Sequence, residues 1–438
     1  MSDLDFLRLD RDLRLTVRRW QTFQRDLRNG EEAFDPFEAT RWVSTRETFL
    51  AASSAPDDPV LAAARRWIYR LAEQRINQYT LLQIEHGYRS TPFVFDEPEH
   101  NRLSLQQIFH QILLDDPRRL SWVHTFARLS GDLSAAHLRV WERRREVAIR
   151  MGLTSPAEIE GCCPDLEKHA EDWLNVTQRI WEVFRKPRYS EYVNATLGKK
   201  ADAGWPVRLT SDALLDWFRK GHLFTSLNLD PGPLPRAYGA SSYLRGMARL
   251  GSAWVDATAP TNQPFVIAHD PYGLKRRTYG AMFGLLLSTP AFLQQTLSLG
   301  KRDIHVHRQV LGLTLLAYSR AAALRILLRP LAQQGPRVLG SKIEDLTFHT
   351  LGFPLKLQNF GASLRLNVDD AQRFSGLFLG HTRLMQMIET HNDDFFRNPK
   401  AIDQLRSEAP RMPETETPSE AIEAGAAQLE RWISDALD

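Results

Sequence analysis

Histidine pairs are the first residues to consider, because a zinc site of the HExxH type needs two histidines four positions apart on one helix face. None of the 13 histidines has that spacing. The nearest pair is His305 and His307 in DIHVHRQ. On a strand these two side chains would share a face and could share a metal, whereas on a helix they diverge. The surrounding pattern indicates a helix start, which favours solvated or capping histidines.

Motifs for nucleophilic and phosphate chemistry are missing as well. The sequence contains no GxSxG, no HRD or DFG, no GxxxxGK[ST] loop and no GxGxxG fingerprint. Asp115-Asp116 and the run Asn392 to Asp394 allow a magnesium interpretation of the kind found in all-α isoprenoid cyclases. Asp116 precedes Pro117, and the second run precedes another expected helix, so caps and turns explain both more simply.

Composition places the chain among ordinary globular proteins. It has 438 residues, 43% of them hydrophobic, and 56 Lys+Arg against 53 Asp+Glu for a formal charge of +3. Such a chain can bury a large core, which excludes intrinsic disorder as the main interpretation. Two adjacent cysteines, Cys162 and Cys163, cannot form a disulfide framework and indicate a reducing compartment. Without a signal-like segment or a long uncharged apolar stretch, we expect a soluble, cytoplasmic protein with no membrane partner.

The small net charge hides an uneven distribution. Residues 192–343 contain 19 Lys+Arg and 7 Asp but no Glu, so this segment carries +12 and the flanks carry −9. The basic residues are scattered over several expected helices and form no single stripe with interleaved aromatics, which argues against nucleic acid as a partner. A basic centre favours an acidic ligand through steering and charge pairing.

Helical periodicity dominates both halves of the chain. The expected helices cover residues 6–29, 58–88, 104–116, 133–152, 167–184, 211–220, 242–250, 276–288, 291–299, 304–331, 340–353, 368–390 and 398–408, with a last one opened by a capping box at 417–420. Asn29-Gly30 should end the first of them, and Ser104 with Gln107 should form a capping box at the start of the third. Strand patterns are confined to 253–257 and to PFVIAH at 264–269. We therefore predict a mainly α fold, a large helical scaffold with one small β-sheet near residues 253–269.

Several phrases occur in the order known from one enzyme family. They are WERRREVAIRMGLTSPAEI, VRLTSDALLDWF, the expected strand PFVIAH, the linker DPYGLKRR, the helix TYGAMFGLLLS and DAQRFSGLFLGHTRLMQMIETHNDDFFRNPKAIDQL. In this order they resemble the thimet oligopeptidase and oligopeptidase F-like zinc metallopeptidases (gluzincins). The resemblance implies an N-terminal helical region (1–130), a degenerate metallopeptidase-like region (131–410) and a linker with a C-terminal helix (411–438).

The family's metal motif is missing where the resemblance places it. Laid on the HExxH helix, this sequence has Gly280 and Gly284 at the two zinc-binding histidines and Ala281 at the catalytic glutamate. The family's third ligand is a Glu on the following helix, which here has no Glu and carries His305 and His307 near that place. A zinc hydrolase needs ligands, an open coordination position and a general base. The resemblance thus implies a scaffold that has lost its chemistry and holds no metal or other cofactor.

The two glycines also have a purely structural interpretation. Gly280 and Gly284 form a GxxxG face, which lets two helix backbones approach closely. Such packing would close the former metal cavity.

A pseudopeptidase could still hold a peptide. An edge strand pairs with an extended peptide main chain without any metal, and 264–269 is the expected edge strand. The three basic residues that follow it favour an acidic peptide or protein segment as the ligand. The peptide-binding candidates are Phe265, Ile267, His269, Lys275, Arg276 and Arg277.

Two other functions stay open. A metal-dependent hydrolase with an unusual site would use His269, His305 and His307, whereas a structural helical protein would bind a partner without holding a peptide. As a peptide binder, the protein could serve as an accessory factor that presents a precursor peptide to modifying enzymes in ribosomal-peptide natural product biosynthesis.

Overall fold

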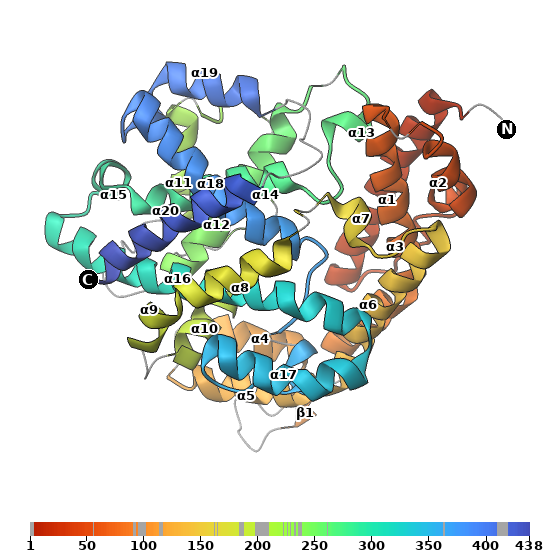
Figure 1. The fold of residues 1–438 in the computed structure, drawn as a ribbon, viewed down its shortest axis with the longest axis horizontal. Coiled ribbons are helices and arrows are strands. Elements are labelled where there is room, and N and C mark those ends of the chain that lie inside the picture. Colours follow the sequence, from red (N-terminus) through yellow and green to blue (C-terminus); the bar gives the residue numbers. More distant parts are fainter. Residues whose placement is uncertain are drawn as a thin grey trace.

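The computed structural model describes residues 4–55, 57–90, 93–94, 102–113, 117–161, 163, 165–183, 188–197, 210–221, 223–225, 227, 229–231, 234, 239–260, 262–361, 364–409 and 419–438. Most of these residues form helices, and two short strands form one antiparallel sheet (Figure 1). The predicted mainly α fold with one small sheet is confirmed. Asp115, Asp116 and the expected linker and capping box at 411–418 lie outside the described residues.

The structure contains the expected helices and several that the sequence pattern did not predict, among them 46–52, 119–129 and 188–197. The first are α1 (Phe6–Asn29), α2 (Arg46–Ala52), α3 (Pro59–Ser90), α4 (Leu105–Leu113), α5 (Arg119–Leu129), α6 (Gly131–Met151) and α7 (Ala157–Glu160). The middle ones are α8 (Leu166–Val176), α9 (Gln178–Val183), α10 (Arg188–Leu197), α11 (Ser211–Lys220), α12 (Ala240–Thr258), α13 (Phe265–Ala268) and α14 (Leu274–Leu285) with the 3-10 turn η3 (Leu286–Ser288). The last are α15 (Pro290–Leu297), α16 (Lys301–Gln333), α17 (Pro336–Leu351), α18 (Asp370–His391), α19 (Pro399–Glu408) and α20 (Ser419–Leu437).

Local signals fix several helix ends. Helix α1 ends at Gly30, which adopts φ 77°, a left-handed conformation that glycine tolerates without strain. Before α4, Ser104 and Gln107 form the predicted capping box: the Ser104 amide donates to Gln107 Oε1 (2.8 Å) and the Gln107 amide donates to Ser104 Oγ (3.3 Å). These caps explain why the sequence pattern located the helices within a few residues.

The location of the predicted sheet is wrong. Residues 253–257 belong to α12, and most of 264–269 forms the single-turn helix α13. The sheet pairs β1 (Phe93–Val94) with β2 (Arg102–Leu103), far from there in the sequence.

A contact from α1 explains the helical turn at α13. The carboxylate of Asp10 accepts the backbone amides of Phe265 and Val266, both at 3.0 Å, and so satisfies the first donors of the turn. Trp67 of α3 packs its ring against that of Phe265, with centroids 4.9 Å apart, and donates from Nε1 to the His269 carbonyl (2.8 Å). This capping carboxylate lies 255 residues earlier in the chain, so no local pattern reveals it.

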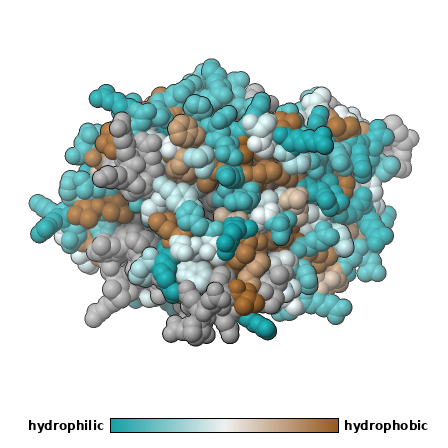
Figure 2. Space-filling view, turned by 90° about the horizontal axis from the view of Figure 1, so that it is seen from below, coloured by the Kyte–Doolittle hydropathy of each residue, from teal (hydrophilic) through white to brown (hydrophobic). Residues whose placement is uncertain are grey.

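Helix α16 is the central element of the fold (Figure 1). It contacts α6, α8, α10, α12, α17, α18 and α20, and its side chains enter two of the three hydrophobic clusters. By length and composition alone α16 could cross a membrane, but 78% of its most apolar window is buried inside the fold. Such burial is typical of a core helix. On the outside, apolar residues gather in several separate groups on the face seen from below (Figure 2).

A buried ion network joins four helices. Glu160 of α7 is fully buried and accepts hydrogen bonds from Arg144 of α6 and Arg329 of α16. Arg144 also donates from Nε to Glu73 of α3 (2.8 Å) and lies over the ring of Trp141, 4.4 Å from its centroid. Burial opposes the charged form of Glu160, but the guanidinium groups of Arg329 and Arg144 outweigh it and lower the pKa of this carboxyl.

Candidate functional site

Helix α14 packs against α12 through glycines. A Cβ atom at Gly280 would lie 2.6 Å from the carbonyl oxygen of Ala248, and one at Gly284 would lie 3.3 Å from that of Leu244. Across the same interface, a Cβ atom at Gly251 would lie 2.7 Å from the Cα atom of Gly280. The backbone of α12 therefore occupies the space that a side chain at position 280 would need, and the helix predicted at 276–288 forms here as expected.

On its other side α14 packs against α18 in the same way. A Cβ atom at Gly380 would lie 2.7 Å from the Cβ atom of Ala281, and one at Gly376 would lie 2.7 Å from that of Arg277. Two glycine-lined contacts thus hold α14 between α12 and α18. The close packing predicted from the GxxxG face is confirmed, and the backbone of α12 fills the space beside Gly280.

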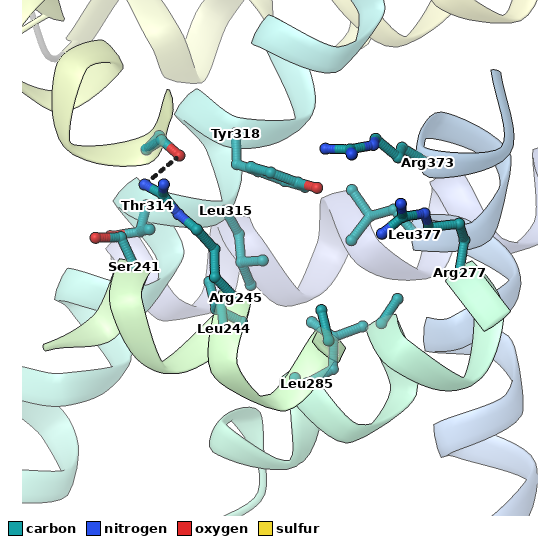
Figure 3. A pocket seen from close by; sticks show the side chains of 14 residues that line it. Ser241, Leu244, Arg245, Arg277, Leu285, Thr314, Leu315, Tyr318, Arg373 and Leu377 are labelled. Atoms are coloured by element: carbon teal, nitrogen blue, oxygen red, sulfur yellow. Dashed lines mark hydrogen bonds between the residues drawn. The ribbon is translucent and has the colours of Figure 1, made fainter. Parts of the chain in front are cut away.

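A pocket remains beside Ala281 and Gly284 (Figure 3). Its volume is about 70 Å³, and α10, α12, α14, α16 and α18 contribute to its walls. The apolar part of the wall consists of Leu244, Leu285, Leu315 and Leu377. The polar part includes Arg245, Arg277, Arg373 and the hydroxyl of Tyr318. We refer to this cavity as the basic pocket.

Two of the three arginines share one carboxylate. Arg373 donates from Nε to Asp369 Oδ1 (3.0 Å), and Arg277 donates to Asp369 Oδ2. Burial would raise the pKa of Asp369, but the guanidinium groups of Arg373 and Arg277 outweigh it and hold this pKa well below its usual value. This trio carries two positive charges and one negative charge at neutral pH.

The third arginine has no carboxylate partner in the described part of the chain. Arg245 donates from Nη2 to the carbonyl oxygens of Asn194 and Ala195, both at 3.4 Å. Burial, with repulsion from Arg249 and other nearby arginines, lowers the pKa of Arg245 to about 10, so it stays charged at pH 7. A desolvated cation balanced only by carbonyl dipoles gains strongly from an incoming anion.

The three arginines and Tyr318 border the same small space. In Figure 3, Arg245 borders the pocket on one side, Arg277 and Arg373 border it on the other, and the Tyr318 hydroxyl points toward the Arg373 side. Chemically, the basic pocket can receive an anion with several charge-assisted hydrogen bonds.

The peptide-pairing segment predicted at 264–269 is not available for that role. The amides of Phe265 and Val266 donate to Asp10, and those of residues 267–269 donate to the carbonyls of Pro264 and Phe265. The Ile267 side chain is buried in a cluster with α1 and α3, and Phe265 packs against that cluster. Main-chain pairing of a peptide with this segment is therefore contradicted, since a helical turn has no free row of donors.

The other sequence candidates separate into two places. His269, Lys275 and Arg276 line a smaller hollow of about 30 Å³ together with Asp256. There Arg276 lies 3.5 Å from Asp256 Oδ2 and donates to the carbonyl of Asp270 (2.9 Å), so its charge is engaged locally. Of the six predicted peptide-binding residues, Arg277 is the one that lines the basic pocket.

The two histidines of the metal alternative do not share a face. His305 is exposed and His307 is buried, as two positions of a helix two residues apart should be. Within the described ranges, no group of three or more His, Cys, Asp and Glu residues could hold a metal ion. From the same helix, the residues that line the basic pocket are Thr314, Leu315 and Tyr318.

Sequence reasoning missed Arg245, Arg373 and Tyr318. Arg245 and Tyr318 lie within the Glu-free segment 192–343, so the charge distribution pointed to the right region without selecting the residues. Arg373 lies outside that segment and reaches the pocket only because α18 packs against α14. A search for arginines that face glycine-rich helix contacts could have found it.

Comparison with protein-family models and with curated proteins finds no match. Among solved structures, the chain is similar to one described as "PZ peptidase A with inhibitor 2", with a TM-score of 0.53 and 9% sequence identity. The match covers 89% of this chain and 84% of that chain. At this identity the likeness shows the fold alone, so the chain has a peptidase-like helical fold.

Proposed function

We propose that this protein binds an acidic peptide or protein segment in the basic pocket and does not cleave it. The observation that carries the proposal is the surface of α14, which presents Gly280, Ala281 and Gly284 where the resemblance places two ligands and a base. The peptidase-like fold supports a peptide as the ligand. The three arginines beside that helix support its acidic character.

Binding follows from the arrangement of donors. A carboxylate of the ligand enters between Arg245 and the pair formed by Arg373 and Tyr318, and accepts charge-assisted hydrogen bonds from both sides. Each such bond to a charged group contributes about 1.5–3 kcal/mol when it is well formed. The +12 charge of residues 192–343 adds steering of acidic ligands toward this region.

Cleavage lacks a suitable group at this place. Among the described residues that line the basic pocket there is no Asp, Glu or His, so none of them can activate a water molecule as a general base. Ala281 cannot take or give a proton. The ligand therefore stays intact in this proposal.

A metal and turnover measurement tests the loss of chemistry. We expect purified protein to contain substoichiometric zinc by mass spectrometry and to leave a broad set of quenched fluorescent peptides uncut. Stoichiometric zinc together with turnover that a chelator abolishes would refute the proposal.

Arg245→Gln tests the site of binding. Since it removes the cation without a carboxylate partner, we expect acidic-peptide affinity to fall roughly 10- to 100-fold, measured by titration calorimetry. Arg302→Gln is a matched control, because it makes the same charge change at an exposed position of α16. Equal losses in the two variants would assign the effect to overall charge and not to the pocket.

The metal alternative makes a different prediction. Replacing His305 and His307 together with alanine should leave the metal content of the purified protein unchanged, because one side chain is exposed and the other is buried. If the double variant lost a metal ion that the original protein holds, the alternative of a hydrolase with a histidine site would be favoured. A purely structural protein would bind a partner and retain no peptide.

The cellular role is part of the proposal. A cytoplasmic peptide binder without turnover suits an accessory factor that presents a precursor peptide to modifying enzymes in ribosomal-peptide natural product biosynthesis. Mass spectrometry of peptides that co-purify from the native host tests this role: we expect a recurrent acidic peptide, and unrelated fragments at background level would argue against it.

A further inference from the structure

We propose that the basic pocket recognises a free C-terminal carboxylate carried by an apolar terminal residue. This inference rests on the proposed function and narrows the ligand from an acidic segment to the end of a chain. It follows from three properties of the pocket: its size, its division into a charged and an apolar wall, and the side from which solvent reaches it.

The pocket is too small for a chain that passes through it. One water-sized sphere needs about 10–15 Å³, so a volume of about 70 Å³ holds a group of only a few heavy atoms. The backbones of α12 and α18 pack against α14 through glycines and limit expansion around the motif. The carboxylate and part of the side chain of one terminal residue fit this space, whereas an extended segment of several residues does not.

The charged wall and the apolar wall face the same small space. Arg245, Arg373 and Tyr318 supply donors, and Leu285 and Leu377 supply apolar surface (Figure 3). A C-terminal residue carries its carboxylate and its side chain on one carbon atom, so both walls are contacted at once. An Asp or Glu inside a chain would bring the flanking backbone N–H groups against a wall that offers mainly donors and apolar carbon, and these N–H groups would lack acceptors.

Solvent reaches the pocket from the side of α14 and α18. The side chains of Arg277 and Arg373 are 32% and 31% exposed, although their carboxylate partner Asp369 is only 21% exposed. The preceding residues of the ligand would leave along this side, while the terminal carboxylate reaches across the pocket toward Arg245. Arg245 is the arginine of the pocket that has no carboxylate partner among the described residues.

A paired peptide library tests the inference. Randomised hexapeptides ending in leucine are synthesised as free acids and as isotopically labelled amides, mixed in equal amounts and equilibrated with the immobilised full-length protein. Mass spectrometry then gives the ratio of acid to amide among the retained peptides. We expect the free acids to be enriched roughly 10- to 100-fold, since amidation removes the charge and one acceptor. Arg245→Gln should bring the ratio close to one, and Arg302→Gln should leave it high.

The outcomes separate this inference from the proposed function. Retention of acids and amides in equal amounts, with internal Asp or Glu enriched, would overturn terminal recognition and leave acidic-peptide binding intact. N-acetyl-leucine serves as a second probe: if it binds and no peptide does, the carboxylate pocket stands and the peptide function fails. Binding of neither probe would overturn both.

Discussion

Replacing Gly280 with alanine is expected to destabilise the protein by about 1–3 kcal/mol, although alanine is the better helix former. The added Cβ atom would lie 2.6 Å from the carbonyl oxygen of Ala248 and 3.3 Å from its Cα atom. Both are backbone atoms of α12, so relief requires that one helix shift against the other. Urea denaturation followed by circular dichroism measures the change in the free energy of unfolding.

Gly340→Ala is the matched control for this effect. Gly340 also lies inside a helix, but a Cβ atom there would meet only the side chain of Leu357, at an ordinary 3.7 Å. The higher helix propensity of alanine should then dominate, and the variant should be more stable by about 0.5–1 kcal/mol. If Gly280→Ala were as neutral or stabilising as this control, α14 would not be held closely against α12.

Introducing an HExxH motif into α14 should fail for the same reason. The triple variant Gly280→His, Ala281→Glu and Gly284→His introduces side chains where helix backbones lie, so we expect a lower melting temperature and no stoichiometric zinc. Tight zinc binding by a folded triple variant would show that the ligand positions still face an open cavity.

Glu160→Gln is expected to cost about 3–5 kcal/mol of stability, because breaking a buried ion network leaves uncompensated charge. The Glu160 carboxylate accepts from both Arg144 and Arg329, and a neutral amide cannot balance two guanidinium groups. Thermal unfolding of the variant measures the loss. Glu146→Gln is the control, since its carboxylate is 55% exposed and lies 3.8 Å from Arg150 at the surface, where such a pair contributes about 0–1 kcal/mol.

The difference in unfolding free energy between the original protein and Glu160→Gln should depend on pH. Because its pKa is lowered in the folded state, Glu160 stabilises the protein fully above the unfolded value of 4.5 and progressively less as the pH falls toward the folded value. The gap between the original protein and Glu160→Gln should therefore narrow below pH 4.5. A gap that stayed constant down to pH 3 would indicate that the carboxylate is not held ionised by its two arginines.

Local signals made most of the helices predictable. Periodic apolar residues, the Ser104 capping box and the terminal Gly30 are contained in a few consecutive positions, and each occurs in the structure as expected. The GxxxG face of Gly280 and Gly284 likewise predicted close packing, because the absence of side chains is itself the property that permits it.

Long-range contacts decided what the sequence could not reveal. PFVIAH has the composition of a strand, but Asp10 caps its amides and Trp67 packs on Phe265, so it forms a helical turn. The basic pocket similarly combines Arg245, Tyr318 and Arg373 from three helices whose contact depends on the packing around α14. The distribution of charge along the sequence indicated a basic region. Which of its side chains meet in one pocket is determined by the packing of the helices.

The most direct test of peptide binding without cleavage is one binding experiment that also detects cleavage products. The full-length protein is incubated with the paired peptide library, and the retained and unbound fractions are analysed by mass spectrometry for enrichment and for fragments. The account predicts intact retained peptides, no fragments, and loss of retention in Arg245→Gln with retention preserved in Arg302→Gln. Peptide fragments that accumulate with time, or retention that is equal in the two variants, would contradict it.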